Sequence, residues 1–355
     1  MAVVSTRVFC CVVGVFLLLL STITSSAQEA RPPLAERQHY QFPFQDYDAF
    51  SHFMLANKES GWTESVLHAA FSRDLFDNCR QRRDVFLDQV SYPGHGGMVK
   101  GWVAGPQEIL SSTEDDQEQL RLLIVYHRGG AAHWGRMVFY EKLVMCHMAN
   151  LGYVMVASDF RGDPEISDPL QGEDDLGLGD AQDSLKLIEW VKTQHPVDDR
   201  RLALWGFSRG TMINSIMLTK LPAVRLVINH GSVVNVVDNE RRNEFDQHVY
   251  PLLVPGYAKL TRQQQDSLLK QVSPYELINH FPDPSSDAVE FLFLHGADDW
   301  RTRVQPAQDW AASLERRGYP VTFITYSAGS HTLSHHFAEV LKAVSMRLAE
   351  VIPVR

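Results

Sequence analysis

One serine of this chain stands between two glycines, in the sequence Gly-Phe-Ser-Arg-Gly at residues 206–210. The apolar residues 202–205 before this G-x-S-x-G motif are typical of a buried strand, and residues 211–219 after it are typical of a helix. A strand, a tight turn and a helix in this order lift the serine hydroxyl above the edge of a sheet, where a helix N-terminus favours negative charge. We therefore interpret Ser208 as a nucleophile rather than as part of an ordinary Gly-Ser turn.

A nucleophilic serine needs a base, and the base needs a carboxylate that orients it. With this type of turn both follow the serine, in the order Ser, Asp or Glu, His. His331 ends a loop of small residues after the last apolar strand, so it is the candidate base. Asp299 is the candidate acid, because it follows the apolar strand at residues 289–294, and its neighbour Asp298 is the alternative. Open α/β sheets hold their sites at the carboxyl ends of strands, where these side chains would meet.

The negative charge that forms on an attacked carbonyl oxygen needs hydrogen-bond donors beside it. In this architecture one backbone N–H comes from the residue after the serine, here Arg209, and one from the loop after an earlier strand. That loop contains Arg128 and Gly129, and a glycine lets the backbone approach a substrate closely. The Arg128 guanidinium either donates to the oxyanion as well or pairs with an acid such as Asp159 or Glu173, and the sequence leaves both alternatives open.

The sequence gives no support for a metal site, a phosphate-binding site or a nucleic-acid-binding surface. His331 and His335 have H-x-x-x-H spacing, but the glutamate of a zincin motif does not accompany them, so we expect no metal. A phosphate-binding G-x-x-x-x-G-K-[ST] loop is absent from the sequence, and no cofactor is indicated. The formal net charge of −10 argues against a nucleic-acid partner, because such a partner needs a basic face.

The elements that would position these residues alternate along the chain. Short apolar strands are predicted at residues 120–126, 154–158, 202–205, 224–229, 289–294 and 321–326. Helices are predicted between and after them, at residues 137–148, 180–194, 211–219, 306–317 and 336–349. This alternation predicts a mostly parallel, doubly wound α/β sheet. The G-x-S-x-G turn within it is typical of the α/β-hydrolase fold. A hairpin at residues 84–104 precedes these elements, and residues 232–285, which lack a strand pattern, are predicted to form an inserted helical cap.

Residues 84–355 form the predicted catalytic domain, and two regions with other roles precede it. Residues 1–27 contain a 13-residue apolar run and then small residues that suit cleavage, which predicts a signal peptide and an exported, periplasmic or secreted protein. An uncleaved anchor is the alternative, although about 20 residues are needed to span a bilayer. Residues 28–83 are predicted to be a helical extension, with helices at 48–54 and 63–80. Cys79 and Cys146 form either one disulfide or two buried thiols.

Together the motifs resemble those of the prolyl oligopeptidase (S9) family of serine hydrolases, over residues 84–350. The resemblance is carried by YHRGG at 126–130, DFRGDPE at 159–165, GEDDLGLGDAQDSLKLIEWV at 172–191, HPVDDRRLALWGFSRGTMIN at 195–214, SPYELI at 273–278, HGADDW at 295–300 and GSH at 329–331. It implies that Ser208 is the nucleophile, Asp299 the acid and His331 the base. Arg128 stands where many members have a tyrosine whose hydroxyl donates to the oxyanion.

The chain departs from large members of that family before the hydrolase strands. Only about 56 residues, 28–83, lie there, which is too few for a β-propeller. Specificity for a free N-terminus is therefore not implied. We expect a serine hydrolase that cleaves peptide or amide bonds of small peptides through an acyl-enzyme. A carboxylesterase acting on small esters is the alternative, and an inactive binding protein on the same scaffold is a third hypothesis.

Overall fold

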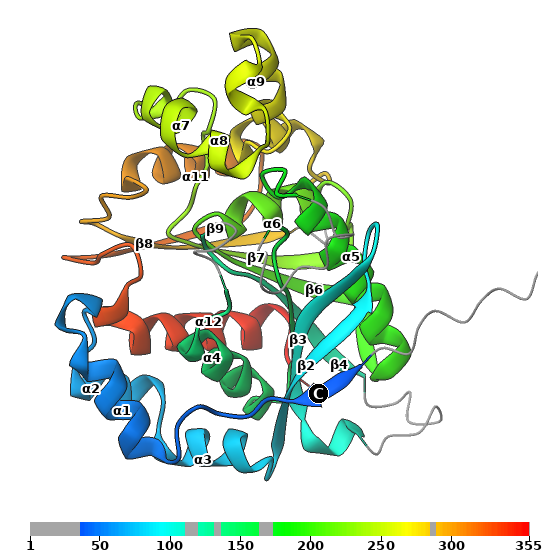
Figure 1. The fold of residues 1–355 in the computed structure, drawn as a ribbon, viewed down its shortest axis with the longest axis vertical. Helices are drawn as coiled ribbons and strands as arrows, with labels where there is room; N and C mark the ends of the chain where they lie inside the picture. Colours follow the sequence, from blue (N-terminus) through cyan, green and yellow to red (C-terminus); the bar gives the residue numbers. More distant parts are fainter. Residues whose placement is uncertain (1–35, 111–119, 131–135, 163–172, 285–288, 355) are drawn as a thin grey trace, which may run out of the picture. The chain divides into compact units, whose positions relative to one another are not determined.

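A nine-stranded sheet of order β1-β2-β3-β5-β4-β6-β7-β8-β9 organises the part of the chain that the computed structural model describes (Figure 1). That part comprises residues 36–110, 120–130, 136–162, 173–284 and 289–354. The predicted signal peptide, residues 1–27, lies outside the described residues. The strands are β1 (Arg37–His39), β2 (Val85–Pro93), β3 (Met98–Pro106), β4 (Arg121–His127), β5 (Val154–Ser158), β6 (Val197–Phe207), β7 (Val224–His230), β8 (Glu290–Gly296) and β9 (Val321–Tyr326).

The predicted parallel sheet is confirmed from β5 through β4 to β9, and the hairpin β2–β3 joins it antiparallel through β3 and β5. Side chains of β4 alternate between two cores: Leu123 and Val125 pack on one face, and Ile124 and Tyr126 on the other. Because both faces are covered, the strand is an unbroken apolar run. β1 was not expected, since three residues are too few to show a strand period.

Five long helices cover the two faces of the sheet. α5 (Leu178–Gln194), α6 (Gly210–Leu218) and α11 (Val304–Arg316) contribute to one core, and α4 (Phe139–Asn150) and α12 (Phe337–Val351) to the other (Figure 1). Short 3-10 turns are η1 (Lys58–Ser60), η2 (Gln107–Leu110), η6 (Tyr257–Lys259), η7 (Ile278–His280) and η8 (Ser334–His336). None of the helices in the described ranges is both long and apolar enough to cross a membrane.

The N-terminal extension packs on the face of α4 and α12 with the helices α1 (Tyr47–Ala56), α2 (Glu64–Ala70) and α3 (Arg73–Gln81). The single helix predicted over residues 63–80 is therefore two. Phe71 adopts an extended backbone and is fully buried, and the Ser72 side chain accepts a hydrogen bond from Leu75 N and begins α3. Cys79 and Cys146 form a disulfide between α3 and α4, which decides the alternative that the sequence left open.

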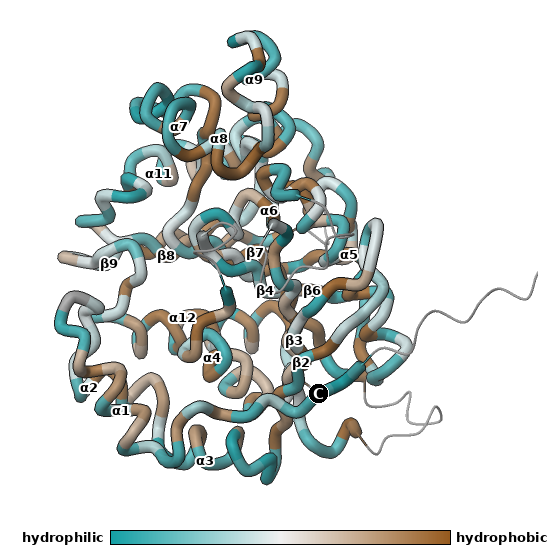
Figure 2. Tube along the Cα trace, viewed as in Figure 1, coloured by the Kyte–Doolittle hydropathy of each residue, from teal (hydrophilic) through white to brown (hydrophobic). Residues whose placement is uncertain are grey.

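The segment between β7 and β8, for which the sequence predicted a cap, contains the short helices α7 (Arg242–His248), α8 (Tyr250–Leu253), α9 (Arg262–Lys270) and α10 (Pro274–Leu277). Arg242 joins α7 to α9, because its guanidinium pairs with both Asp246 and Asp266. Figure 2 shows hydrophilic residues dominating α7 and hydrophobic residues gathered around α8. Tyr250 and Leu253 of α8 are buried in the core that also contains α6, so the cap is anchored next to the Ser208 turn.

Candidate active site

Ser208 lies in the turn between β6 and α6 with a φ of +52°, a left-handed conformation that is strained for a serine. Both flanking glycines are sterically required. A Cβ on Gly206 would lie 2.5 Å from the carbonyl carbon of Gly210, and a Cβ on Gly210 would lie 2.0 Å from the His127 carbonyl oxygen. The Ser208 backbone N–H donates to His230 O at 2.8 Å, which holds the turn against β7. The turn therefore presents the Ser208 hydroxyl at the carboxyl end of the sheet.

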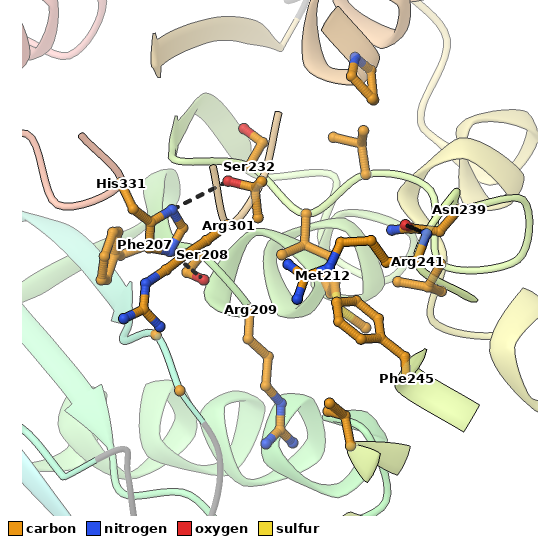
Figure 3. Close-up of a pocket in the computed structure, with 18 of the residues that line it drawn as sticks. Phe207, Ser208, Arg209, Met212, Ser232, Asn239, Arg241, Phe245, Arg301 and His331 are labelled. Atoms are coloured by element: carbon orange, nitrogen blue, oxygen red, sulfur yellow. Dashed lines mark hydrogen bonds between the residues drawn. The ribbon is translucent and has the colours of Figure 1, made fainter. Parts of the chain in front are cut away.

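His331 reaches Ser208 from the loop after β9. Its Nε2 is 2.9 Å from Ser208 Oγ, and the Phe207 ring packs against the imidazole at a centroid distance of 5.1 Å. Figure 3 shows the imidazole beside Ser208 on the wall of a cavity. Ser208 and His331 are 123 positions apart in the sequence, and the fold brings them into hydrogen-bonding contact.

Asp299 lies on the other side of the imidazole. Its Oδ2 is 2.7 Å from His331 Nδ1, and its Oδ1 accepts hydrogen bonds from the N–H groups of Arg301 and Thr302, both at 2.9 Å. Asp298 is exposed, whereas Asp299 is only 4% exposed. Of the two acids that the sequence offered, Asp299 is thus the one that contacts His331.

Burial and neighbouring groups shift the pKa values of Asp299 and His230. Burial alone would raise the pKa of Asp299, but hydrogen bonds from His295 and His331 hold it well below its usual range. His230, which packs on the Phe207 ring, has its pKa lowered to about 3 by burial and by the neighbouring His331 and His295. The site therefore keeps Asp299 ionised and His230 uncharged near neutral pH.

Two of the predicted oxyanion donors, Gly129 and Arg209, have their backbones beside Ser208. A Cβ on Gly129 would lie 3.1 Å from Ser208 Cβ, so the loop after β4 passes directly beside the serine. Arg209 is the N-cap of α6, at the helix end where N–H groups have no helical acceptor. Its side chain points away from Ser208 in Figure 3 and forms a buried ion pair with Asp174 at 2.6 Å and with Asp180 at 3.0 Å.

The Arg128 side chain does not reach the cavity. It is 1% exposed, its guanidinium lies 4.0 Å over the Phe160 ring, and its Nη1 donates to Gly129 O at 2.9 Å. These contacts direct the guanidinium away from the cavity, and they favour the second alternative of the sequence over donation to the oxyanion. Burial raises the pKa of the Asp159 carboxyl, and the Arg128 charge acts against that rise. Sequence reasoning missed the ring contact because nothing local indicates that Phe160, on the loop after β5, offers its ring to Arg128.

A cavity of about 1030 Å³ opens over Ser208 and His331. Apolar side chains of α6 and the cap form part of its wall: Met212, Val234, Val236, Phe245, Tyr250 and Leu253. Four of the seven large apolar side chains that are exposed in the described residues also line it: Val138, Leu252, Tyr275 and Trp300. Periodicity could not reveal these residues as one surface, because they come from four separate segments.

No group of three or more His, Cys, Asp or Glu side chains in the described ranges is arranged to hold a metal ion. Of the H-x-x-x-H pair, His331 contacts Ser208 and Asp299, while His335 lies against Gly61 of the N-terminal extension. The arrangement is suited to nucleophilic attack by an activated serine, which needs no metal.

Comparisons with known proteins find chains that are similar to this one in sequence and in fold. A family model described as the prolyl oligopeptidase family matches residues 140–349. The uncharacterized peptidase YuxL of Bacillus subtilis is 22% identical over 255 residues, which are 70% of this chain and 36% of that protein. The acylamino-acid-releasing enzyme of Mus musculus is 20% identical over 227 residues, covering 63% of this chain and 30% of that enzyme.

Among solved structures, the acylaminoacyl peptidase of Pyrococcus horikoshii superposes with a TM-score of 0.59 at 18% identity. The superposition covers 79% of this chain and 43% of that one, and it confirms the predicted α/β-hydrolase fold. The chain thus spans about a third of the length of the curated relatives that it matches.

Proposed function

The chain belongs to the prolyl oligopeptidase family, and from that premise we propose that it is a serine peptidase in which Ser208, His331 and Asp299 form the catalytic triad. The observation that carries the proposal is the continuous hydrogen-bonded path from Ser208 Oγ through the imidazole to Asp299 Oδ2, with steps of 2.9 and 2.7 Å. A strained serine turn, a buried carboxylate and a cavity over the serine support the same conclusion.

In the proposed reaction Ser208 Oγ attacks the substrate carbonyl carbon while its proton passes to His331 Nε2. The backbone N–H of Arg209 and the loop at Gly129 stabilise the oxyanion of the tetrahedral intermediate. The carbon–nitrogen bond then breaks as His331 returns the proton to the leaving amine. Water attacks the acyl-enzyme, His331 accepts its proton, and the same proton restores the Ser208 hydroxyl as the acid product leaves.

The cavity supports peptides with large apolar residues as substrates. Its wall around Met212 and Phe245 is apolar, and the exposed side chains of Leu252 and Trp300 extend this surface outward. Side chains that stay exposed in the free protein gain most when a substrate covers them. We therefore expect apolar residues near the scissile bond to increase turnover.

A carboxylesterase is the second candidate, because the same triad hydrolyses esters and the cavity walls would accept an apolar acyl group. An inactive binding protein is disfavoured by the Ser208–His331 contact. Comparing aminoacyl-nitroanilides with nitrophenyl esters of the same acyl group separates the two enzyme candidates. Hydrolysis of the esters alone would identify a carboxylesterase.

Labelling with a fluorophosphonate probe tests the triad directly. We expect the wild-type protein to be labelled and Ser208→Ala to lose both labelling and hydrolysis by several orders of magnitude, with little change in melting temperature. Ser267→Ala, on the exposed surface of α9, is the matched control and should retain both. Turnover by a folded Ser208→Ala protein would refute the assignment.

The apolar substrate preference has its own controls. Leu252→Ser and Trp300→Ser should each lower kcat/KM for apolar oligopeptides about fivefold, the equivalent of about 1 kcal/mol of lost apolar burial. Leu151→Ser and Met346→Ser alter exposed apolar residues outside the cavity, at 39% and 54% exposure, and should have no effect. Equal effects of all four would refute the preference while leaving the peptidase assignment intact.

We also propose that the protein is exported, as the leader at residues 1–27 predicts. The Cys79–Cys146 disulfide supports an oxidising compartment. Fractionating cells that produce the chain with and without residues 1–27 tests this. Export that does not depend on those residues would contradict it.

A further inference from the structure

The hydroxyl of Thr302 lies where the acid and the base meet. Thr302 Oγ1 is 2.8 Å from Asp299 Oδ2, 3.2 Å from His331 Nδ1 and 3.2 Å from Gly231 O. From this junction we infer that Thr302 is a positioning residue that holds the carboxylate and the imidazole in their productive arrangement. The inference rests on the proposed function and adds a fourth side chain to its machinery.

The single proton of that hydroxyl has two acceptors to choose from. Asp299 Oδ2 is nearer than Gly231 O and is charged, so it takes the stronger hydrogen bond. The lone pairs of Thr302 Oγ1 then face the Nδ1–H of His331, which Asp299 and Thr302 share. A proton held on Nδ1 leaves Nε2 free to accept the proton of Ser208.

The backbone of Thr302 keeps its hydroxyl in this place. Its N–H donates to Asp299 Oδ1 at 2.9 Å, and its carbonyl oxygen accepts a hydrogen bond from His295 Nε2 at 2.7 Å. His295 is fully buried on β8, so it ties the loop to the sheet. Thr302 therefore contacts the triad through both its backbone and its side chain.

Removing the Thr302 hydroxyl takes one hydrogen-bond donor away from the Asp299 carboxylate. The other titratable and charged groups around the pair are His295 of β8, His230 of β7 and the exposed Asp298 and Arg301 of the same loop, and all of them stay in place. The carboxylate loses a donor at 2.8 Å and then attracts a protonated imidazole more strongly. The imidazole also loses the acceptor at Thr302 Oγ1, which acts in the opposite direction, but that contact is longer, at 3.2 Å, and involves no charged partner in the resting site. We therefore expect the acidic limb of the pH–rate profile to move to higher pH, which a purely structural residue would not cause.

Thr302→Val keeps the shape of the side chain and removes the hydroxyl. We expect kcat to fall about tenfold with KM changed less than about twofold, and the acidic limb to move up by about half a pH unit. Thr302→Ser should restore both to near wild-type values. Thr219→Val is the matched control, because its hydroxyl also donates a hydrogen bond, to Ile216 O at 2.7 Å, but at the far end of α6.

The outcomes separate the possible roles of the residue. An unchanged kcat and pH profile in Thr302→Val overturns the inference, and so does a lowered melting temperature without either kinetic change. If the valine variant does not fold, Thr302→Ala carries the same expectation. Activity that survives in Ser208→Ala would instead refute the proposed function, so the two failures are distinguishable.

Discussion

Asparagine at position 299 should disable the triad by reversing one hydrogen bond. Asp299 Oδ1 accepts from two backbone N–H groups, those of Arg301 and Thr302. An amide oxygen must take that position, which places the amide NH2 where Oδ2 now faces His331 Nδ1. The NH2 group donates, so Nδ1 must accept and the imidazole proton moves to Nε2. That nitrogen, 2.9 Å from Ser208 Oγ, then cannot accept the serine proton.

The expected magnitude follows from losing the tautomer while keeping the geometry. In serine proteases this change costs about 10⁴ in kcat, or roughly 5 kcal/mol of transition-state stabilisation. Asparagine has nearly the volume of aspartate and keeps both backbone contacts to Oδ1, so the melting temperature of Asp299→Asn should change little.

Measuring kcat of the Asp299→Asn protein on a peptide or ester substrate, beside its melting temperature, checks this reasoning. Asp298→Asn is the matched control, because Asp298 is exposed next to it, and kcat should stay within about twofold. More than a tenth of the wild-type kcat in folded Asp299→Asn would refute the tautomer argument. A larger loss in Asp298→Asn would move the acid role to that residue.

Three further predictions concern the scaffold of the site. Arg128→Met should lower the melting temperature and change kcat of the folded fraction by less than about tenfold, because the guanidinium contacts Phe160 and Gly129 O and not the cavity; a loss near 10² with an unshifted melting temperature would contradict this. The double change of Cys79 and Cys146 to Ala should lower the free energy of unfolding by about 4 kcal/mol, because the disulfide closes a loop with a sequence separation of 67, and urea unfolding in the absence of reductant measures it. Burial lowers the pKa of His127 to about 4, so between that value and its higher unfolded pKa the unfolded chain binds a proton that the folded chain does not. The free energy of unfolding therefore decreases as the pH is lowered, and from this residue alone we expect a loss of about 2 kcal/mol between pH 7 and pH 5. Urea unfolding at both pH values measures this difference, and His127→Gln should remove it.

Local signals predicted much of the fold because they are carried by neighbouring residues. The six apolar strands from β4 onward have the predicted positions to within a few residues, except that β6 begins earlier. The strands β4 to β8 contain apolar runs that are buried on both faces, whereas β9, at the edge of the sheet, is only partly buried. The helix break at Phe71 was missed, since the residue leaves the helix to bury its ring against Phe50 and Phe337, which lie elsewhere in the chain. Tertiary burial overrides helical spacing there.

The amino-acid sequence alone determined that Ser208 stands in a strand–turn–helix motif. Glycine is the only residue type that fits at positions 206 and 210, because a Cβ there would clash with the turn, with α6 or with the end of β4. The G-x-S-x-G motif contains both glycines, so this steric requirement can be recognised from the sequence. The order of the serine, the acid and the histidine along the chain was likewise readable, because the fold sets it.

Only the tertiary structure decided which neighbouring groups meet. The choice of Asp299 over Asp298 depends on the turn in which the N–H groups of Arg301 and Thr302 bind one carboxylate and direct it inward. The placement of the Arg128 guanidinium depends on a ring from another loop, at Phe160. Hydrogen bonds and ring contacts act over a few ångströms between segments that are distant in sequence, so no local pattern specifies them.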